Sequence, residues 1–177
     1  MKNRKVLIVG AGFAGTTIAR VLAENGFEVD IMTNIIGRVH GYLGTYNEST
    51  QSVFDLDDNT KYDQHMKNYD FLIIPGGVKS MEKVRQNKKI IQFISEFDKA
   101  GKTIGCICSG AQLLISAKVV NNRKISGYYS MIDDLINAGA KYEDKPSVID
   151  KNIITTAHYK DLGPWMGSIL KVFYSNK

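Results

Sequence analysis

Cys108 is the residue with the clearest capacity for covalent chemistry, because it ends an apolar run in the segment KTIGCICSGAQLLISA, residues 102–117. A helical pattern begins directly after it, so we expect the thiol at a tight turn from strand to helix. Ser109, Gly110 and Ala111 are small enough for the strained backbone of such a turn. Unpaired amide N–H groups of the helix would favour the thiolate. Cys108 is therefore a candidate nucleophile, with a small packing residue as the alternative.

Cys106 lies two positions earlier in the same predicted strand. Two cysteines at this spacing do not easily close a disulfide, and no second cluster of cysteine and histidine completes a zinc site. We therefore expect Cys106 to pack in the core, and we predict neither a structural disulfide nor a bound metal.

The segment GAGFAG, residues 10–15, follows a buried run and opens a helical pattern. It matches the dinucleotide fingerprint and resembles the start of flavin enzymes, which would imply FAD or NAD. That fingerprint needs an acidic residue directly after the second strand, where Thr33 and Asn34 stand instead. Gly12 and Gly15 are instead expected to allow a tight turn, with space for a phosphate or carboxylate at the helix N-terminus. We predict no cofactor.

Other candidate site residues follow predicted strands. The run YDFLII, residues 69–74, leads into Pro75-Gly76-Gly77, whose amides would face a developing oxyanion if the segment is more than a plain turn. His158 follows the last predicted strand, so it is the first candidate for a general base, with a surface histidine as the alternative. His40 is the second candidate, and His65 is expected at an ordinary surface position.

The apolar runs predict how these residues are positioned. Alternating strands and helices indicate an α/β protein with a mainly parallel sheet. Strands are expected at 5–9, 27–32 and 69–74, before Cys108, and as a pair around the turn 150–152; helices are expected at 16–26, 88–100, after Cys108, near 133–139 and at 162–174. Residues 35–58 should form a hairpin or an irregular excursion with short β-type pieces such as SVFDL, residues 52–56.

The composition limits the class of protein. A chain of 177 residues with 44% hydrophobic content is long enough for one domain, which we place at 1–177. The net charge of +5 comes from dispersed lysines, so dedicated nucleic-acid binding is not indicated. No apolar run approaches the ~20 residues of a membrane span, so we predict a cytoplasmic protein without membrane contact.

Four stretches together resemble the ThiJ/PfpI superfamily of deglycase-like proteins, which has the class I glutamine-amidotransferase-like fold. They are YDFLIIPGG, GKTIGCICSGAQLL, RKISGYYSMIDDLINAGA and VIDKNIITTAHYKDL, in family order and spacing. The resemblance implies a flavodoxin-like three-layer α/β sandwich with helices on both faces, and a homodimer. It also implies that Cys108 is the reactive cysteine, that the amides of Gly76, Gly77 and Ser109 form an oxyanion site, and that Tyr128 lines the pocket.

Two departures from the family pattern affect the chemistry. The family carries a glutamate after the first strand, where residues 13–17 hold no carboxylate, and its protease-like members have a histidine where Ser109 stands. The leading hypothesis is a cysteine-dependent hydrolase or lyase that acts on a small carbonyl, amide or related metabolite, with His158 moving protons. The alternative is a non-catalytic stress-responsive, redox or ligand-binding protein. A third hypothesis is an FAD- or NAD-binding protein that uses GAGFAG.

Overall fold

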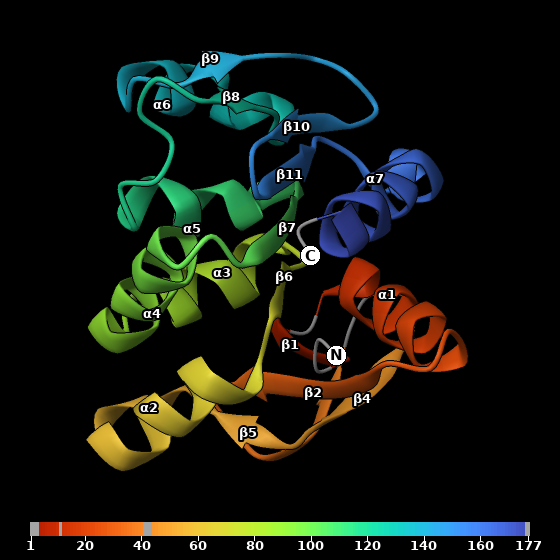
Figure 1. The fold of residues 1–177 in the computed structure, drawn as a ribbon, viewed down its shortest axis with the longest axis vertical. Helices are drawn as coiled ribbons and strands as arrows, with labels where there is room; N and C mark the ends of the chain where they lie inside the picture. The colour runs from red at the N-terminus through yellow and green to blue at the C-terminus, as the bar shows by residue number, and fades with distance from the viewer. Residues whose placement is uncertain (1–3, 11, 41–43, 176–177) are drawn as a thin grey trace.

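The computed structural model describes residues 4–10, 12–40 and 44–175 (Figure 1). Within these residues, seven strands form the central sheet in the order β10-β11-β7-β6-β1-β2-β5. Their bounds are β1 (Lys5–Val9), β2 (Glu28–Thr33), β5 (Gln51–Ser52), β6 (Phe71–Ile74), β7 (Thr103–Ile107), β10 (Val148–Asp150) and β11 (Ile153–Thr156). Neighbouring strands are parallel except β10 and β11, which are antiparallel.

Most residues of the central strands β1, β6 and β7 are apolar because both faces of the sheet are covered. In β1, Leu7 and Val9 pack on one face, whereas Val6 and Ile8 pack on the other. Strands that are buried on both faces have continuous apolar sequences rather than alternating ones. This is why the run KVLIV is readable as a central parallel strand from the sequence.

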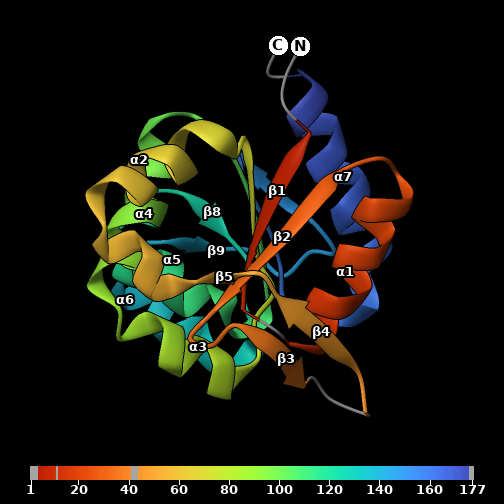
Figure 2. The same ribbon diagram turned by 90° about the horizontal axis from the view of Figure 1, so that it is seen from below.

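Helices cover both faces and make the expected three layers (Figures 1 and 2). On one face lie α1 (Phe13–Glu24) and α7 (Leu162–Ser175), which contribute Ile18, Leu22, Trp165 and Phe173 to the core. The other face is covered by α2 (Asn59–Asn68), α3 (Val78–Arg85), α4 (Lys88–Lys99), α5 (Ala111–Ser116) and α6 (Ile132–Asn137). The flavodoxin-like sandwich expected from the sequence is confirmed.

Two short strand pairs lie outside the main sheet. The antiparallel pair β3 (Gly37–His40) and β4 (Tyr46–Ser49) is the hairpin expected between residues 35 and 58. The parallel pair β8 (Lys124–Ile125) and β9 (Lys141–Tyr142) joins segments on either side of α6. The β-type assignment of SVFDL was wrong, because Val53–Asp57 forms a 3-10 helix whose first turn is closed by a capping box between Ser52 and Asp55.

The prediction that His65 occupies an ordinary surface position was also wrong. It belongs to α2, and its side chain is buried on the inner face of that helix, with its ring edge-on to Tyr69 at 5.7 Å between centroids. Helix α2 itself was not predicted, because its sequence NTKYDQHMKN is mostly polar. It begins where the Asp58 carboxylate accepts hydrogen bonds from the amides of Thr60 and Lys61.

The topology places the functional candidates at one edge. Strands β1, β6, β7 and β11 are parallel, so their carboxyl ends meet at the same edge of the sheet. After β1 the chain adds β2 and β5 on one side of the sheet and then β6, β7 and β11 on the other side, so the strand order reverses between β1 and β6. Ligands of open α/β sheets bind at such switch points. Across the described ranges, none of the helices is both long and apolar enough to cross a bilayer.

Candidate active site

Cys108 lies at a sharp turn between a buried strand and a helix. Strand β7 ends at Ile107, the residues Cys108–Gly110 form a 3-10 turn, and α5 begins at Ala111. The backbone of Cys108 is left-handed, with φ of 61°, which residues other than glycine rarely adopt. The structure therefore confirms the elbow, and it leaves the cysteine side chain partly exposed.

The elbow is held by backbone that approaches it closely. A β-carbon on Gly76 would lie 2.7 Å from the carbonyl oxygen of Ile107 and 3.1 Å from Cβ of Cys108. A β-carbon on Gly110 would lie 2.8 Å from the carbonyl oxygen of Ile74. Only glycine fits at these two positions, so the turn after β6 and the turn after β7 are packed against each other.

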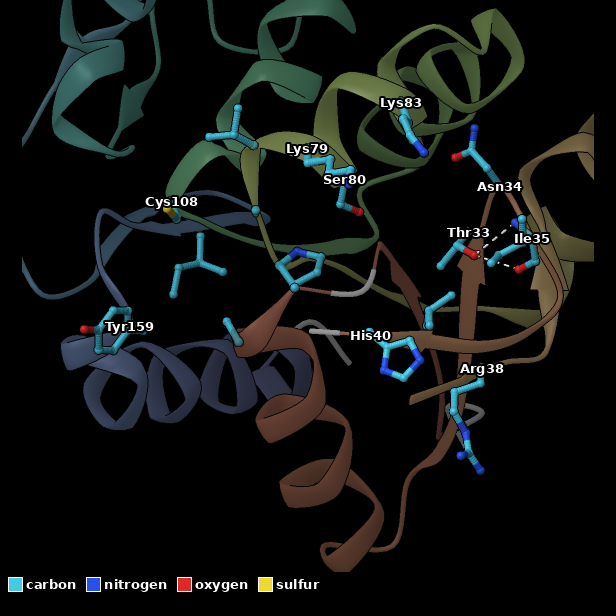
Figure 3. Close-up of a pocket in the computed structure, with 17 residues that line it drawn as sticks. Thr33, Asn34, Ile35, Arg38, His40, Lys79, Ser80, Lys83, Cys108 and Tyr159 are labelled. Carbon is cyan, nitrogen blue, oxygen red and sulfur yellow. Dashed lines mark hydrogen bonds between the residues drawn. The ribbon is translucent and has the colours of Figure 1, made fainter. Parts of the chain in front are cut away.

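A cavity of about 800 Å³ opens beside the elbow (Figure 3). Four residues proposed from the sequence line it: Gly12, His40, Gly77 and Cys108. Gly12 follows β1 and caps α1, whereas Gly77 follows β6 and caps α3. The cavity therefore lies at the switch point of the sheet, and Cys108 is part of its wall.

His158 lies next to Tyr128 and is not among the residues that line the cavity. Its ring stacks with that of Tyr128 at 6.4 Å and contacts that of Tyr159 at 4.1 Å between centroids. Its Nδ1 accepts a hydrogen bond from the amide of Lys160 at 3.2 Å, so the neutral ring carries its proton on Nε2. Within the described chain, the sulfur of Cys108 makes no hydrogen bond to this histidine or to another side chain.

Tyr128 and Ser109 both lie at the elbow. The amide of Tyr128 donates a hydrogen bond to the carbonyl oxygen of Cys108 at 3.3 Å, and its ring is partly exposed. Ser109 is buried, and its hydroxyl has no hydrogen-bond partner among the described atoms. Neither side chain lines the cavity, so a contribution from Ser109 to the site would come from its backbone amide.

The glycine-rich segment packs against the turn after β6. A β-carbon on Gly15 would lie 3.3 Å from Cβ and Cγ of Pro75, so this glycine allows α1 to approach the turn after β6.

The dinucleotide fingerprint needs an acidic residue directly after the second strand, and the nearest one in the sequence, Asp30, lies within β2. Its carboxylate accepts hydrogen bonds from the hydroxyls of Tyr69 at 2.8 Å and Thr50 at 3.0 Å. The carboxylate of Asp30 therefore has a structural role, because it links β2 to Tyr69 and Thr50.

Cys106 packs in the core as expected, and both cysteines are free thiols. Burial raises the pKa of the Cys106 thiol well above its ordinary value, so this residue stays protonated. The two thiols therefore differ in their access to solvent. Among the described histidine, cysteine and acidic side chains, no group of three or more is placed to hold a metal ion.

Several cavity residues were missed by sequence reasoning. Tyr159 lies near Cys108, while Asn34 and the lysines Lys79 and Lys83 of α3 lie along the remaining wall (Figure 3). The lysines were overlooked because α3 was not predicted. Their spacing of four residues directly after Pro-Gly-Gly was the available signal, since such residues share one face of a helix.

The comparisons with known proteins agree with this architecture. The family model of the DJ-1/PfpI family matches residues 11–172. The chain is 34% identical over 151 residues to Deglycase PfpI of Pyrococcus furiosus, covering 85% of this chain and 86% of the relative. It is 33% identical over 147 residues to General stress protein 18 of Bacillus subtilis, covering 82% of this chain and 81% of the relative.

A solved structure extends the likeness over almost the whole chain. The ThiJ/PfpI domain protein from Brachyspira murdochii superposes with a TM-score of 0.85 at 16% identity, covering 99% of each chain. At this identity the likeness concerns the fold alone. The family match over residues 11–172 and the relatives above 30% identity show that the chain belongs to the DJ-1/PfpI family, within the ThiJ/PfpI superfamily.

Proposed function

We propose that this protein is a cysteine-dependent enzyme that acts on small carbonyl or amide compounds, with Cys108 as the nucleophile. The observation that carries the proposal is the left-handed backbone of Cys108 at the wall of the cavity. A non-glycine residue keeps such a conformation only where its surroundings enforce it, and these positions concentrate at active sites. A cysteine that served packing alone would gain nothing from this strain.

In the proposed reaction with an amide, the Cys108 thiol loses its proton and the sulfur attacks the carbonyl carbon. The π electron pair moves to the carbonyl oxygen, which the amides of Gly76, Gly77 and Ser109 would stabilise. Cleavage of the C–N bond then releases an amine that takes up the proton and leaves a thioester. Water hydrolyses the thioester to a carboxylic acid and restores the thiol. The name of the Pyrococcus relative, Deglycase PfpI, supports hydrolytic chemistry of this kind.

His158 is the proposed carrier of the proton. Its ring lies next to Tyr128, whose amide is bonded to the elbow itself. Because the sulfur has no hydrogen bond to this histidine, a bound substrate or a water must bridge the two groups. Catalytic hydrogen bonds often form only when substrate is bound.

Replacement of Cys108 by alanine tests the nucleophile. Turnover of small aldehydes, ketones and amides should be abolished in Cys108→Ala and retained in Cys106→Ala, which removes the buried thiol instead. In parallel, iodoacetamide should alkylate Cys108 at pH 7 faster than it alkylates glutathione. Turnover that survives in Cys108→Ala would overturn the proposal.

A second function, that of a redox-responsive stress protein, is favoured by two observations. No carboxylate lines the described part of the cavity, and the Cys108 sulfur has no hydrogen-bond partner there. The site therefore lacks a carboxylate or a hydrogen-bonded side chain that could take the proton from the thiol. The Bacillus relative carries the name of a stress protein. This function requires peroxide to convert Cys108 to a sulfenic or sulfinic acid, which intact mass would detect as one or two added oxygen atoms. Unchanged mass after mild peroxide would exclude it.

A further inference from the structure

We propose that the wall of the cavity formed by α3, away from Cys108, binds a phosphate or carboxylate group of the substrate, through Lys79 and Lys83. This inference rests on the proposed function, because it names the substrate class for the same cavity. The compound that fits is a small carbonyl or amide that carries its negative charge at the end remote from the reacting carbon.

The first observation is the charge of the cavity wall. Its charged lining residues are Arg38, Lys79 and Lys83, and no aspartate or glutamate lines its described part. His40 adds a group that can donate a hydrogen bond. A concave surface lined by charges of one sign raises the local concentration of ions of the opposite sign.

The second observation is that the two lysines are available. The side chains of Lys79 and Lys83 make no ion pair or hydrogen bond with another described residue. They lie four residues apart on α3, where like charges on one helix face repel each other. Glu82 does not neutralise them, because it faces a separate groove on the other side of α3, next to Arg85. An anion between the two ammonium groups would remove the repulsion.

Arg38 is in a different position, although it also lines the cavity. Its Nε is 3.3 Å from Oε1 of Glu48, and its guanidinium lies over the ring of Tyr46 at 4.4 Å. In Figure 3 its side chain points away from the cavity. We therefore assign anion binding to the two lysines and not to Arg38.

The third observation is the backbone between the lysines and the elbow. Helices α1 and α3 both begin at the cavity with glycine caps, Gly12 and Gly77, and neither has an acidic residue in its first turn or a side-chain cap from the described residues. The two starts are adjacent, since a β-carbon on Gly77 would lie 3.6 Å from Cα of Gly12. Two helix N-termini add positive potential on the same side as the lysines.

The layout separates binding from reaction. In Figure 3, Cys108 and Tyr159 lie at one end of the cavity, while Lys83 and Asn34 lie at the other. A group held by the lysines would therefore leave the carbonyl end of the same molecule to reach the sulfur. The cavity of about 800 Å³ has space for a small metabolite in this arrangement.

The test measures anion binding without relying on catalysis. Inorganic phosphate and acetate are titrated into Cys108→Ala protein at constant ionic strength, with binding followed by amide chemical shifts near Gly12 and Gly77. The double variant Lys79→Gln/Lys83→Gln, made in the same background, should bind the anions at least 10-fold more weakly. The matched control, Lys67→Gln/Lys171→Gln, loses the same charge at exposed positions on α2 and α7 and should bind as tightly as the parent.

The outcomes are distinct from those of the nucleophile test. Tighter binding of phosphate than of acetate would assign a phosphate group to the substrate, and the reverse order would assign a carboxylate. Equal affinity of the two double variants, or no saturable binding in the parent, would overturn the proposal. Because the cysteine is absent throughout, failure of Cys108 as a nucleophile would not change the result.

A second measurement uses protein with its cysteine intact. The rate of alkylation by iodoacetate, which is an anion, is compared with that by neutral iodoacetamide. Because the lysines raise the local concentration of anions throughout the cavity, their removal should lower the ratio of these rates several-fold. An unchanged ratio would contradict the proposed anion site.

Discussion

Gly76, in the turn after β6, is in van der Waals contact with Cys108 of the elbow. A β-carbon on Gly76 would lie only 3.1 Å from Cβ of Cys108, and the φ of Gly76 is 79°. The Pro-Gly-Gly segment and the elbow are therefore parts of one rigid structure. Displacement of either would move the sulfur relative to the amides proposed to stabilise the oxyanion.

Gly76→Ala should damage both stability and reactivity. The new methyl group would lie 2.7 Å from the carbonyl oxygen of Ile107 and would force a left-handed alanine. We expect a loss of about 3 kcal/mol in the free energy of unfolding, measured in urea, and slower alkylation of Cys108. Gly101→Ala is the control, because its φ is 68° but nothing lies within 4 Å of its β-carbon. It should lose about 1 kcal/mol and keep the alkylation rate of the parent. Equal effects of the two variants would contradict the contact.

Gly105→Ala should overpack the strand that carries the elbow. A β-carbon there would lie 2.5 Å from Cδ1 of Ile169 and 3.1 Å from Cζ2 of Trp165, both on α7. We expect a loss of about 2 kcal/mol by urea unfolding, since side chains on α7 must shift. Gly163→Ala, at an open position of the same helix, should change stability by less than about 1 kcal/mol. A neutral Gly105→Ala would show that α7 packs less closely on β7.

The two thiols should differ sharply towards alkylating agents. Cys106 is buried and its thiol has a raised pKa, whereas Cys108 is partly exposed. Iodoacetamide at pH 7.5 should add one carbamidomethyl group to the native chain and two in guanidinium chloride. Peptide mapping should place the first group on Cys108. Modification of Cys106 under native conditions would show that the core opens around β7.

Much of the fold was predictable because its signals are local. The run KVLIV is apolar after Lys5, and the strand before Cys108 is apolar after Thr103, as is typical of strands buried on both faces. The elbow was visible because Cys108 separates a strand pattern from a helix pattern. The homodimer, the cytoplasmic location and the single domain over residues 1–177 stay predictions.

The features that escaped prediction depend on tertiary structure. Helix α3 has eight residues with two buried anchors, Met81 and Val84, which is too short for a periodic pattern. Without this helix, Lys79 and Lys83 could not be placed at the cavity. His65 was misjudged because a mostly polar helix gives no indication that one polar side chain turns inward. The position of His158 likewise depends on the packing of its ring against Tyr128, which the distance between these residues in the sequence does not predict.

Buried His65 should make stability depend on pH. Burial is the largest effect on its imidazole and lowers the pKa. The unfolded chain therefore binds the proton more readily, so stability is fully present above the unfolded pKa of about 6.5 and is lost as pH falls through the lower folded value. Urea unfolding between pH 5 and 7.5 should show this loss, and His65→Gln should reduce it. An identical pH dependence in the variant would assign the effect to other groups.

The identity of the general base can be decided by exchanging each candidate histidine in turn. If His158 carries the proton, His158→Gln should lower kcat on the identified substrate by about 10²- to 10⁴-fold and remove one limb of the pH–rate profile. His40→Gln should mainly raise KM, because His40 lines the cavity but lies away from Cys108 in Figure 3. Both imidazoles are replaced by the same amide, so the two variants are matched. A loss of kcat in His40→Gln alone would transfer the role to His40. If neither variant lost kcat, the proton would have to move directly between Cys108 and the substrate or water, which would fit a site that has no carboxylate along its described wall.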